Sequence, residues 1–133
     1  MNKINKKNKQ QGFTLVEILV VVAIIGILAS IIVPKLTTKV DDARVQKAQH
    51  DIKTISSVLE LYKLDKYSYP SSEQGLEALV GSYLDTLPKD PWDRAYLYLS
   101  PGSRNAGFFD LYTFGADGAS GGNNENKDIG NWE

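Results

Sequence analysis

A single carboxylate, that of Glu17, directly precedes residues 18–33, which are apolar apart from one glycine and one serine. An acidic side chain at the centre of a bilayer costs about 2.5–3.5 kcal/mol on insertion scales, and less near the edge, so such a group usually has a partner. Cleavage of the peptide bond between Gly12 and Phe13 would create an α-amine, which is cationic at neutral pH. In a stack of identical subunits, that amine could pair with Glu17 of a neighbour.

Two simpler interpretations of this segment leave Glu17 unexplained. A secretory signal peptide also combines a basic start with an apolar core, but a small-x-small cleavage site follows that core. Here Pro34 and a long polar helical pattern follow it instead. A plain membrane anchor fits the length of the apolar run. Neither interpretation gives the carboxylate a purpose, so we favour cleavage and assembly.

The tail at residues 115–132 is rich in glycine and contains a second group of candidate functional residues. Asp117, Asp128 and the amides and carboxylate between them offer the oxygen ligands that a hard cation such as calcium requires. The spacing is not that of an EF-hand, because the third and fifth positions of that loop need oxygen side chains. Composition alone would also suit a solvated, disordered end. The residues themselves leave both alternatives open.

The sequence offers little for catalysis or for nucleic-acid binding. His50 is the only histidine, it lies in a helical pattern, and the chain has no cysteine. No nucleophile–base arrangement and no phosphate-binding loop is recognisable, so we expect the protein not to be an enzyme. The net charge is −1, and loss of residues 1–12, which hold four lysines and no acids, would leave −5. This mildly acidic balance argues against nucleic-acid binding.

The basic N-terminus predicts the orientation of the chain in the membrane. By the positive-inside rule, its lysines place this end in the cytoplasm and the larger part of the chain outside the inner membrane. That compartment allows disulfides, yet the chain has no cysteine with which to fix its tail. The lysines concerned are Lys3, Lys6, Lys7 and Lys9.

One long helix must carry these groups. Apolar residues recur mostly three or four positions apart beyond the membrane run, which predicts a helix from about Phe13 to about Leu64, roughly 80 Å long. Pro34 lacks an N–H and crowds the preceding turn, so we predict a kink or a local loss of helix near residues 26–34. A membrane-exit bend and a segment that unwinds during filament assembly are equally compatible with this proline. The predicted apolar stripe consists of Leu36, Val40, Ala43, Ala48, Ile52, Ile55, Leu59 and Tyr62.

Shorter elements follow the long helix. We predict a short helix that Ser72 caps and that ends at Leu79, followed by an extended segment around two prolines. Aromatic-rich runs at residues 95–99 and 108–114 predict two strands. Their side chains are expected to cover the second half of the long helix.

Residues 12–34 closely resemble the leader and first helix of type IV pilins and of the pseudopilins of type II secretion. The resemblance implies that a prepilin peptidase cuts after Gly12 and that the leader stays in the cytoplasm. It also implies that Phe13 becomes the first residue of the mature chain and is N-methylated, and that Glu17 acts in assembly.

Further motifs resemble the major pseudopilin family of type II secretion systems and cover nearly the whole mature chain. They include Tyr69-Pro70, Leu87-Pro88-Lys89-Asp90-Pro91-Trp92, Gly115-Ala116-Asp117-Gly118 and Asp128-Ile129-Gly130-Asn131-Trp132. The resemblance implies an α+β, type IV pilin-like fold. In it a long N-terminal helix, membrane-spanning in its first half, packs on a small antiparallel β-sheet, and a C-terminal calcium loop replaces the pilin disulfide. The implied parts are a leader at residues 1–12, a transmembrane and filament-core helix at 13–34, and a periplasmic pilin-like domain at 35–133.

The same resemblance implies a set of calcium ligands. Two are side chains and two are backbone carbonyls: Asp117 and Asp128, and Phe114 and Ala119. Some family members have two adjacent aspartates before the isoleucine, and here the first is Lys127. A further ligand must then come from Asn124, Glu125, Asn126 or water, and Glu125 is the candidate with a carboxylate. Family members also often have glycine where this chain has Asp93, which we expect to change only a turn.

The function implied is that of the major structural subunit of a secretion pseudopilus, a periplasmic filament that drives export of folded proteins across the outer membrane. Implied partners are further copies of the chain, minor pseudopilins, the prepilin peptidase, the inner-membrane assembly platform and the membrane itself. The subunit would cross the inner membrane once before assembly and lie in the periplasmic filament afterwards.

Two alternative functions fit the sequence less well. A type IV pilus major pilin for adhesion or motility is disfavoured by the lack of a C-terminal cysteine pair and by the aspartates of the tail. A membrane-anchored calcium-binding module leaves the pattern from Gly12 to Glu17 without a purpose.

Overall fold

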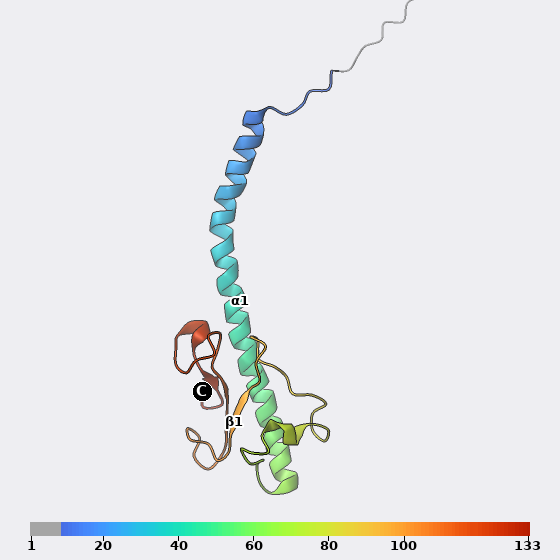
Figure 1. Cartoon of the computed structure of the whole chain (residues 1–133), viewed down its shortest axis with the longest axis vertical. Coiled ribbons are helices and arrows are strands. Elements are labelled where there is room, and N and C mark those ends of the chain that lie inside the picture. The colour runs from blue at the N-terminus through green and yellow to red at the C-terminus, as the bar shows by residue number, and fades with distance from the viewer. Residues whose placement is uncertain (1–8) are drawn as a thin grey trace, which may run out of the picture. The chain divides into compact units, whose positions relative to one another are not determined.

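The structure is a computed structural model that describes residues 9–133, and the predicted leader lysines Lys3, Lys6 and Lys7 lie outside the described residues. The chain divides into two compact units, Met1–Thr38 and Lys39–Glu133. This division falls shortly after the limit predicted at residue 34. A single helix, α1 (Leu15–Lys66), extends into both units. The shorter elements that follow α1 all belong to the second unit (Figure 1).

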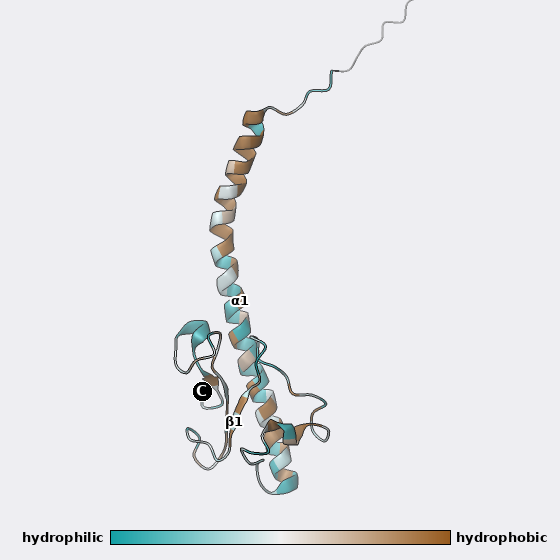
Figure 2. Ribbon diagram, viewed as in Figure 1, coloured by the Kyte–Doolittle hydropathy of each residue, from teal (hydrophilic) through white to brown (hydrophobic). Residues whose placement is uncertain are grey.

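In the first unit, α1 exposes its apolar residues on every side. The large aliphatic side chains from Ile18 to Val33 each keep 49–63% of their accessible surface. Figure 2 shows this stretch as the most hydrophobic part of the helix. By length and composition, α1 contains a segment that is apolar enough to cross a membrane. A helix that is apolar all round requires lipid or neighbouring helices around it.

α1 continues through Gly26 and Pro34 without interruption. Beside the proline, the Thr37 hydroxyl donates to the Pro34 carbonyl at 2.9 Å, and the Thr38 hydroxyl donates to the Lys35 carbonyl at 3.1 Å. A proline removes one bond of the helical ladder, and the turns on either side keep theirs. The predicted local loss of helix is therefore wrong for the single chain, whereas the kink at Pro34 stays a prediction.

The core of the second unit lies against the C-terminal half of the predicted apolar stripe. On α1 the buried residues are Ala48, Ile52, Ile55 and Leu59. The residues that pack against them are Leu76, Leu79, Tyr96, Phe109, Leu111 and Ile129. Nearer the N-terminus, Val40 and Ala43 of the same stripe are exposed. The chain thus covers only part of the stripe that its periodicity predicts.

Three short antiparallel strands form one sheet in the order β1-β2-β3. Tyr98 of β1 (Leu97–Leu99) lies opposite Leu111 of β2 (Asp110–Thr113), and Thr113 lies opposite Ile129 of β3 (Ile129–Gly130). Figure 1 shows β1 beside the second half of α1. The first two strands are confirmed in shortened form. The third, β3, lies in the tail, where the sequence predicted only a loop.

The Asn131 side chain ends the sheet beyond β3. Its Oδ1 atom accepts a hydrogen bond from the Leu111 N–H at 3.0 Å, and its Nδ2 donates to the Phe109 carbonyl at 2.9 Å. Its backbone N–H donates to the Leu111 carbonyl at 3.0 Å. The Asn131 side-chain amide therefore pairs with backbone groups at the start of β2, on the side where the short strand β3 has ended.

Two 3-10 helices complete the unit. They are η1 (Leu76–Leu79) and η2 (Asn124–Asn126). The helix predicted from Ser72 is thus confirmed only over its last turn. The segment before it forms turns instead, where the Gln74 side chain accepts a bond from the Ser71 N–H at 2.9 Å.

Tyrosine hydroxyls join the loops to carboxylates on α1. Tyr96 donates to Asp51 at 2.8 Å, Tyr69 to Glu60 at 2.6 Å and Tyr83 to Asp65 at 2.8 Å. Burial and the bond to Glu60 raise the pKa of Tyr69 to about 12, so this hydroxyl stays a donor at neutral pH. The aromatic rings thus pack in the core while their polar ends fix the helix register.

The carboxylate of Asp110 organises the connection between β1 and β2. The backbone N–H groups of Ser103, Arg104 and Asn105 donate to it at 2.7, 2.9 and 2.9 Å, and the Ser103 hydroxyl donates at 3.0 Å. Glycine is required at Gly102, because a Cβ there would lie 2.6 Å from Asp110 Oδ1. Burial alone would raise the pKa of Asp110, but these bonds stabilise the ionised form and lower the pKa.

Asp110→Asn should lower the free energy of unfolding by about 2–3 kcal/mol at neutral pH, because an amide offers one acceptor oxygen to several donors. Since the folded pKa of Asp110 is depressed, its contribution is present above the unfolded pKa of about 4 and is lost as pH falls through the folded pKa. Denaturant unfolding of a fragment that begins at Lys35, at neutral and at acidic pH, measures both effects. Asp42→Asn, at an exposed position on α1, is the matched control. Equal losses in the two variants would contradict this role.

Candidate functional site

The first candidate site is the start of α1. Gly12 and Phe13 precede the helix, so the predicted scissile bond lies in non-helical chain. The Thr14 N–H donates to Glu17 Oε2 at 2.8 Å, and the Glu17 N–H donates to the Thr14 hydroxyl at 3.2 Å. This reciprocal pair is a capping box, and a carboxylate in the first turn also suits the helix dipole. The spacing of Thr14 and Glu17 could have predicted the cap from the sequence.

Gly12 has no structural need for its missing side chain. A Cβ at this position would meet nothing within 4 Å, and the position is not among those with positive φ. In the single chain, therefore, the local fold does not account for a glycine before Phe13. A requirement for it would come from a protein that recognises this segment.

The second candidate site is the tail, where two carboxylates bind the same short segment. Asp117 Oδ1 accepts a hydrogen bond from the Ala119 N–H at 3.1 Å, and Asp128 Oδ1 accepts one from the Gly121 N–H at 3.0 Å. Asp128 is buried and Asp117 is exposed. The structure thus brings both predicted side-chain ligands to residues 119–121, next to the predicted carbonyl ligand Ala119.

The guanidinium of Arg104 lies beside the Asp128 carboxylate. Arg104 Nη2 lies 3.8 Å from Asp128 Oδ2, and its guanidinium carbon lies 4.2 Å from the centre of the Trp132 ring. Lys127, where the resemblance led us to expect an aspartate, forms an ion pair with Glu133. The lysine therefore contributes no oxygen to the tail, and its charge is compensated locally.

Glu125 makes different contacts from the two aspartates. A hydrogen bond with Asp41 on α1 raises the pKa of the Glu125 carboxyl group, and burial and the Asp41 charge act in the same direction. The Glu125 carbonyl accepts a bond from the Ala116 N–H at 2.8 Å. Within residues 9–133, no three acidic, histidine or cysteine side chains are grouped as a metal site would need. The structure therefore does not bring Glu125 to Asp117 and Asp128.

The donor set of the tail suits a hard cation in kind, since its members are carboxylate and carbonyl oxygens. The carboxylates number two, those of Asp117 and Asp128. A calcium ion takes six to eight oxygen ligands, so backbone carbonyls and water would have to complete its shell. Phe114 and Ala119, which flank Asp117 in the chain, are the predicted sources of such carbonyls.

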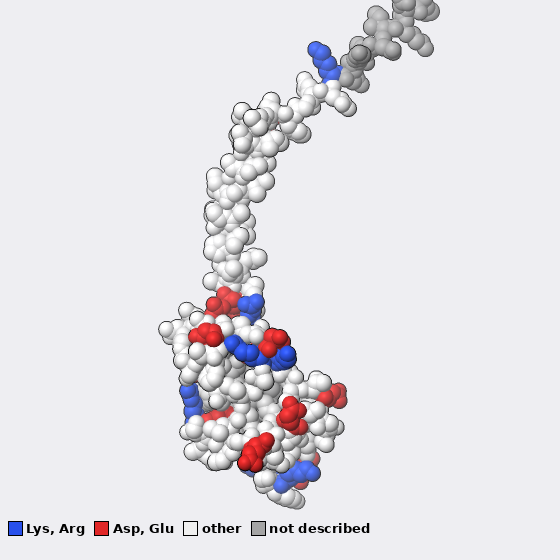
Figure 3. Space-filling view, viewed as in Figure 1, with Lys and Arg blue, Asp and Glu red and all other residues white. Residues whose placement is uncertain are grey.

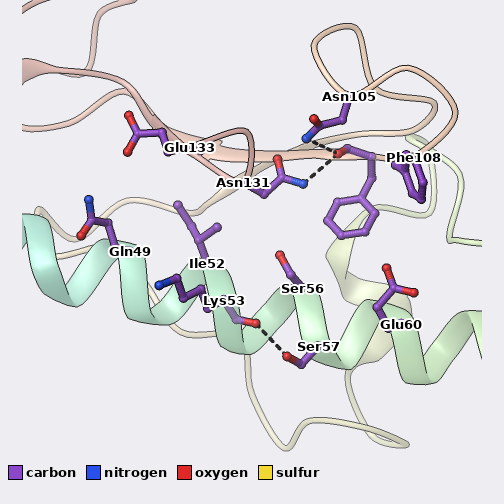
Figure 4. Close-up of a pocket in the computed structure, with 12 residues that line it drawn as sticks. Gln49, Ile52, Lys53, Ser56, Ser57, Glu60, Asn105, Phe108, Asn131 and Glu133 are labelled. Atoms are coloured by element: carbon purple, nitrogen blue, oxygen red, sulfur yellow. Dashed lines mark hydrogen bonds between the residues drawn. The ribbon is translucent and has the colours of Figure 1, made fainter.

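A groove of about 770 Å³ runs between α1 and the sheet (Figure 4). Figure 4 shows Lys53, Ser56 and Glu60 on the helix side and Asn105 and Asn131 on the other. His50, the one histidine of the sequence, is not among the residues that line this groove. The lining offers no nucleophile with a neighbouring base.

Two family models match this chain, and each covers one of the two candidate sites. A family model described as "Type II secretion system (T2SS), protein G" matches residues 35–132, and one described as "Prokaryotic N-terminal methylation motif" matches residues 7–33. The chain belongs to the type II secretion protein G family. The protein G match includes the whole tail, and the methylation motif includes Gly12, Phe13 and Glu17.

Individual relatives agree with the protein G family match. "Type II secretion system core protein G" of Pseudomonas aeruginosa is 48% identical over 142 residues, which cover 96% of this chain and 99% of the relative. The protein of the same name from Vibrio cholerae is 49% identical over 140 residues and covers 96% and 94%. The crystal structure of the major pseudopilin from the type 2 secretion system of enterohaemorrhagic Escherichia coli is 35% identical, with a TM-score of 0.61. That match covers 74% of this chain and 95% of the other.

These relatives confirm the predicted family and the predicted α+β, type IV pilin-like fold of an apolar N-terminal helix with a small antiparallel sheet. Protein G is a family of structural pseudopilin subunits, which agrees with the prediction that the chain is not an enzyme. The calcium loop stays a prediction for this chain.

Three groups in the structure make contacts that were not predicted from the sequence. They are the Asp110 carboxylate, the Asn131 amide and the Arg94 guanidinium, which contacts both Asp90 and the tail. Each hydrogen-bonds to backbone groups of a loop or of a distant part of the chain. Neither a sequence motif nor the spacing of apolar residues predicts bonds of this kind.

Proposed function

We propose that the chain is the major structural subunit of a type II secretion pseudopilus. The observation that carries this proposal is the protein G match over residues 35–132, together with relatives that match nearly end to end. The subunit polymerises into a periplasmic filament that drives export of folded proteins across the outer membrane. No reacting group is needed for this task, since the work of the subunit is assembly.

The apolar half of α1 supports a filament core. Its side chains need a dry environment, which lipid provides before assembly and neighbouring helices provide afterwards. Apart from a basic side chain near the N-terminal end, the charged side chains seen in Figure 3 lie mainly on the second unit, as expected for the part that faces water. Lipid and neighbouring helices both surround these apolar side chains, so transfer from membrane to filament need not expose them to water.

The start of α1 supports proteolytic maturation. A protease needs an accessible, non-helical bond, and the bond between Gly12 and Phe13 precedes the helix. In this proposal a prepilin peptidase cleaves after Gly12, and Phe13 is then N-methylated. Glu17 exchanges its bond with the Thr14 N–H for the α-amine of a neighbouring subunit, since an ion pair is strong where water is excluded.

The proposed partners and location follow from the same route. The subunit lies in the inner membrane as a single-pass protein with a cytoplasmic N-terminus, and enters the periplasmic pseudopilus on assembly. Its partners are further copies, minor pseudopilins, the prepilin peptidase and the inner-membrane assembly platform. A role as a type IV pilus major pilin is not favoured, because the relatives bear the name of a secretion protein.

Deletion of the gene from its host should abolish export of folded proteins to the medium and leave surface motility and adhesion unchanged. The physical reason is that the filament acts within the periplasm rather than beyond the cell. Activity of exported enzymes in culture supernatants measures the first effect, and motility on agar measures the second. Restoration by a plasmid copy is the control. Loss of motility with normal export would support the pilus alternative instead.

Glu17→Gln and Glu17→Val should both insert into the membrane yet reduce assembled filaments by at least about tenfold, as expected for loss of a desolvated ion pair. Glutamine keeps an oxygen for the Thr14 N–H, so it separates the helix cap from the charge. Electron microscopy of sheared filaments, normalised to subunit abundance, measures assembly. Glu73→Val, on an exposed loop, is the matched control. Filaments of normal number in Glu17→Gln would show that the cap alone matters.

We propose that the tail binds calcium through the Asp117 and Asp128 carboxylates and the Phe114 and Ala119 carbonyls. Two carboxylates directed at one short segment repel each other, and a divalent cation would remove that repulsion. The chain has no disulfide that could order the tail. Glu125 is a further ligand only if it leaves Asp41, and otherwise water takes its place. Bound calcium contributes charge neutralisation and order to the fold.

Calcium in hundredfold excess over its Kd should raise the melting temperature of a fragment starting at Lys35 by about 10 °C relative to chelator. Magnesium should have little effect, because it demands a smaller octahedral shell and keeps its waters. Asp117→Ala should abolish most of the calcium effect, whereas Asp85→Ala, on an exposed loop, should not. Equal melting temperatures in calcium and chelator for the unmutated fragment would exclude the metal site.

A further inference from the structure

Arg94 lies between a buried carboxylate and the start of the tail. The Asp90 side chain is 0% exposed, and Arg94 Nε lies 3.8 Å from its Oδ2 atom. The same carboxylate accepts bonds from the N–H groups of Trp92 and Arg94 at 3.0 and 2.8 Å, and from the Thr113 hydroxyl at 2.5 Å. An ionised carboxylate is costly to bury unless it is paired and hydrogen-bonded. Asp90 therefore determines where Arg94 lies.

The guanidinium of Arg94 also faces backbone carbonyls of the tail. Its Nη2 atom donates to the Gly115 carbonyl and to the Ala116 carbonyl, the latter at 3.2 Å. Gly118 lies against the same group, because a Cβ at this position would overlap Arg94 Nη1. The Arg94 guanidinium thus lies against Asp90 and against Gly115, Ala116 and Gly118 of the tail.

These contacts restrict a segment that is costly to order. Gly115 and Gly118 have φ angles of 75° and 65°, and glycine loses more conformational freedom on folding than any other residue. Arg94 bonds to residues 21 and 22 positions further along the chain. A guanidinium is always charged and donates to several acceptors in one plane. It can therefore hold carbonyl groups together, as a bound metal ion does.

We propose that Arg94 is a positioning residue of the tail, whose guanidinium acts as a built-in cation and orders residues 115–118 without a metal. Through this segment it fixes the backbone of Asp117, whose carboxylate is a proposed calcium ligand. The second step rests on the proposed calcium site, whereas the first does not.

The sign of the effect on calcium binding follows from where the charge lies. A free cation near the site would weaken calcium binding by repulsion. Arg94 is paired with Asp90, and its carbonyl partners are Gly115 and Ala116 rather than the predicted ligands Phe114 and Ala119. Loss of Arg94 removes order from the site more than it removes repulsion. Calcium binding therefore weakens.

The test is hydrogen exchange by mass spectrometry on the full-length chain in detergent micelles, in chelator and across a calcium titration. In chelator, Arg94→Met should accelerate exchange in peptides covering residues 115–121 by about tenfold or more, because charge-assisted bonds are lost. Peptides from residues 52–59 of α1 should exchange as in the unmutated chain. The calcium concentration that gives half-maximal protection should rise several-fold in this variant.

Two further variants separate charge from geometry. Arg94→Lys keeps the charge but cannot span two carbonyls and Asp90, so it should behave like Arg94→Met. Lys89→Met removes a charge from the same loop, where Lys89 pairs with the exposed Asp93 at 3.2 Å. This control should leave the exchange of the tail unchanged.

The outcomes are distinct for the two proposals. Unchanged exchange of residues 115–121 in Arg94→Met in chelator would overturn the role of Arg94, and so would equal acceleration in residues 52–59, since that reports general destabilisation. Normal protection in Arg94→Lys would overturn the requirement for a guanidinium. If calcium changes nothing in the unmutated chain, the calcium proposal fails, and the comparison in chelator still decides the role of Arg94.

Discussion

The apolar first half of α1 cannot remain in water, and the other features of the molecule follow from this constraint. Its large aliphatic side chains from Ile18 to Val33 are about half exposed in the single chain, at 49–63% of their accessible surface. Burial of that surface is worth roughly 25 cal/mol per Å², so a bilayer or a bundle of like helices has to surround it. A filament of identical subunits provides the second environment without any further component in its core.

The same constraint explains why a charge at Glu17 is acceptable. In the single chain the carboxylate accepts the Thr14 N–H at 2.8 Å, which satisfies it within the first turn of the helix. A local partner lowers the cost of placing an acid near the bilayer edge. The α-amine that the proposed cleavage would create lies at Phe13, one residue before that N–H. Insertion and assembly can therefore use the same carboxylate with different donors.

The parts of the fold that depend on periodicity were predictable, and those that depend on distant polar contacts were not. Apolar residues that recur three or four positions apart predicted α1 to within two residues at each end. They also placed Ile52, Ile55 and Leu59 on its buried face. The sheet was predicted as two strands, because β3 has two residues and pairs through backbone groups that carry no side-chain pattern.

In the candidate sites, the chemistry of single residues was readable but their partners were not. Asp117 and Asp128 were identified as oxygen donors, and the structure places both at residues 119–121. Glu125 was the candidate with a carboxylate among Asn124, Glu125 and Asn126, yet Asp41 on α1 contacts it in the fold. Asp93 adopts a φ of 66° in its turn, a backbone conformation that favours glycine, so the expected effect on a turn has a physical basis. Arg94 belongs to no motif, since its acceptors are backbone carbonyls.

Arginine and a divalent cation would serve different needs of the tail. Arg94 balances the charge of Asp90 and binds neutral carbonyls, so it leaves the charges of Asp117 and Asp128 in place. Arg104, at 3.8 Å from Asp128, offsets one of those two charges in part. The remaining negative charge is concentrated on a glycine-rich segment without a disulfide, where repulsion favours opening of the loop. An arginine can order the backbone of this segment, whereas the proposed divalent cation, with both carboxylates as ligands, would remove the repulsion between them.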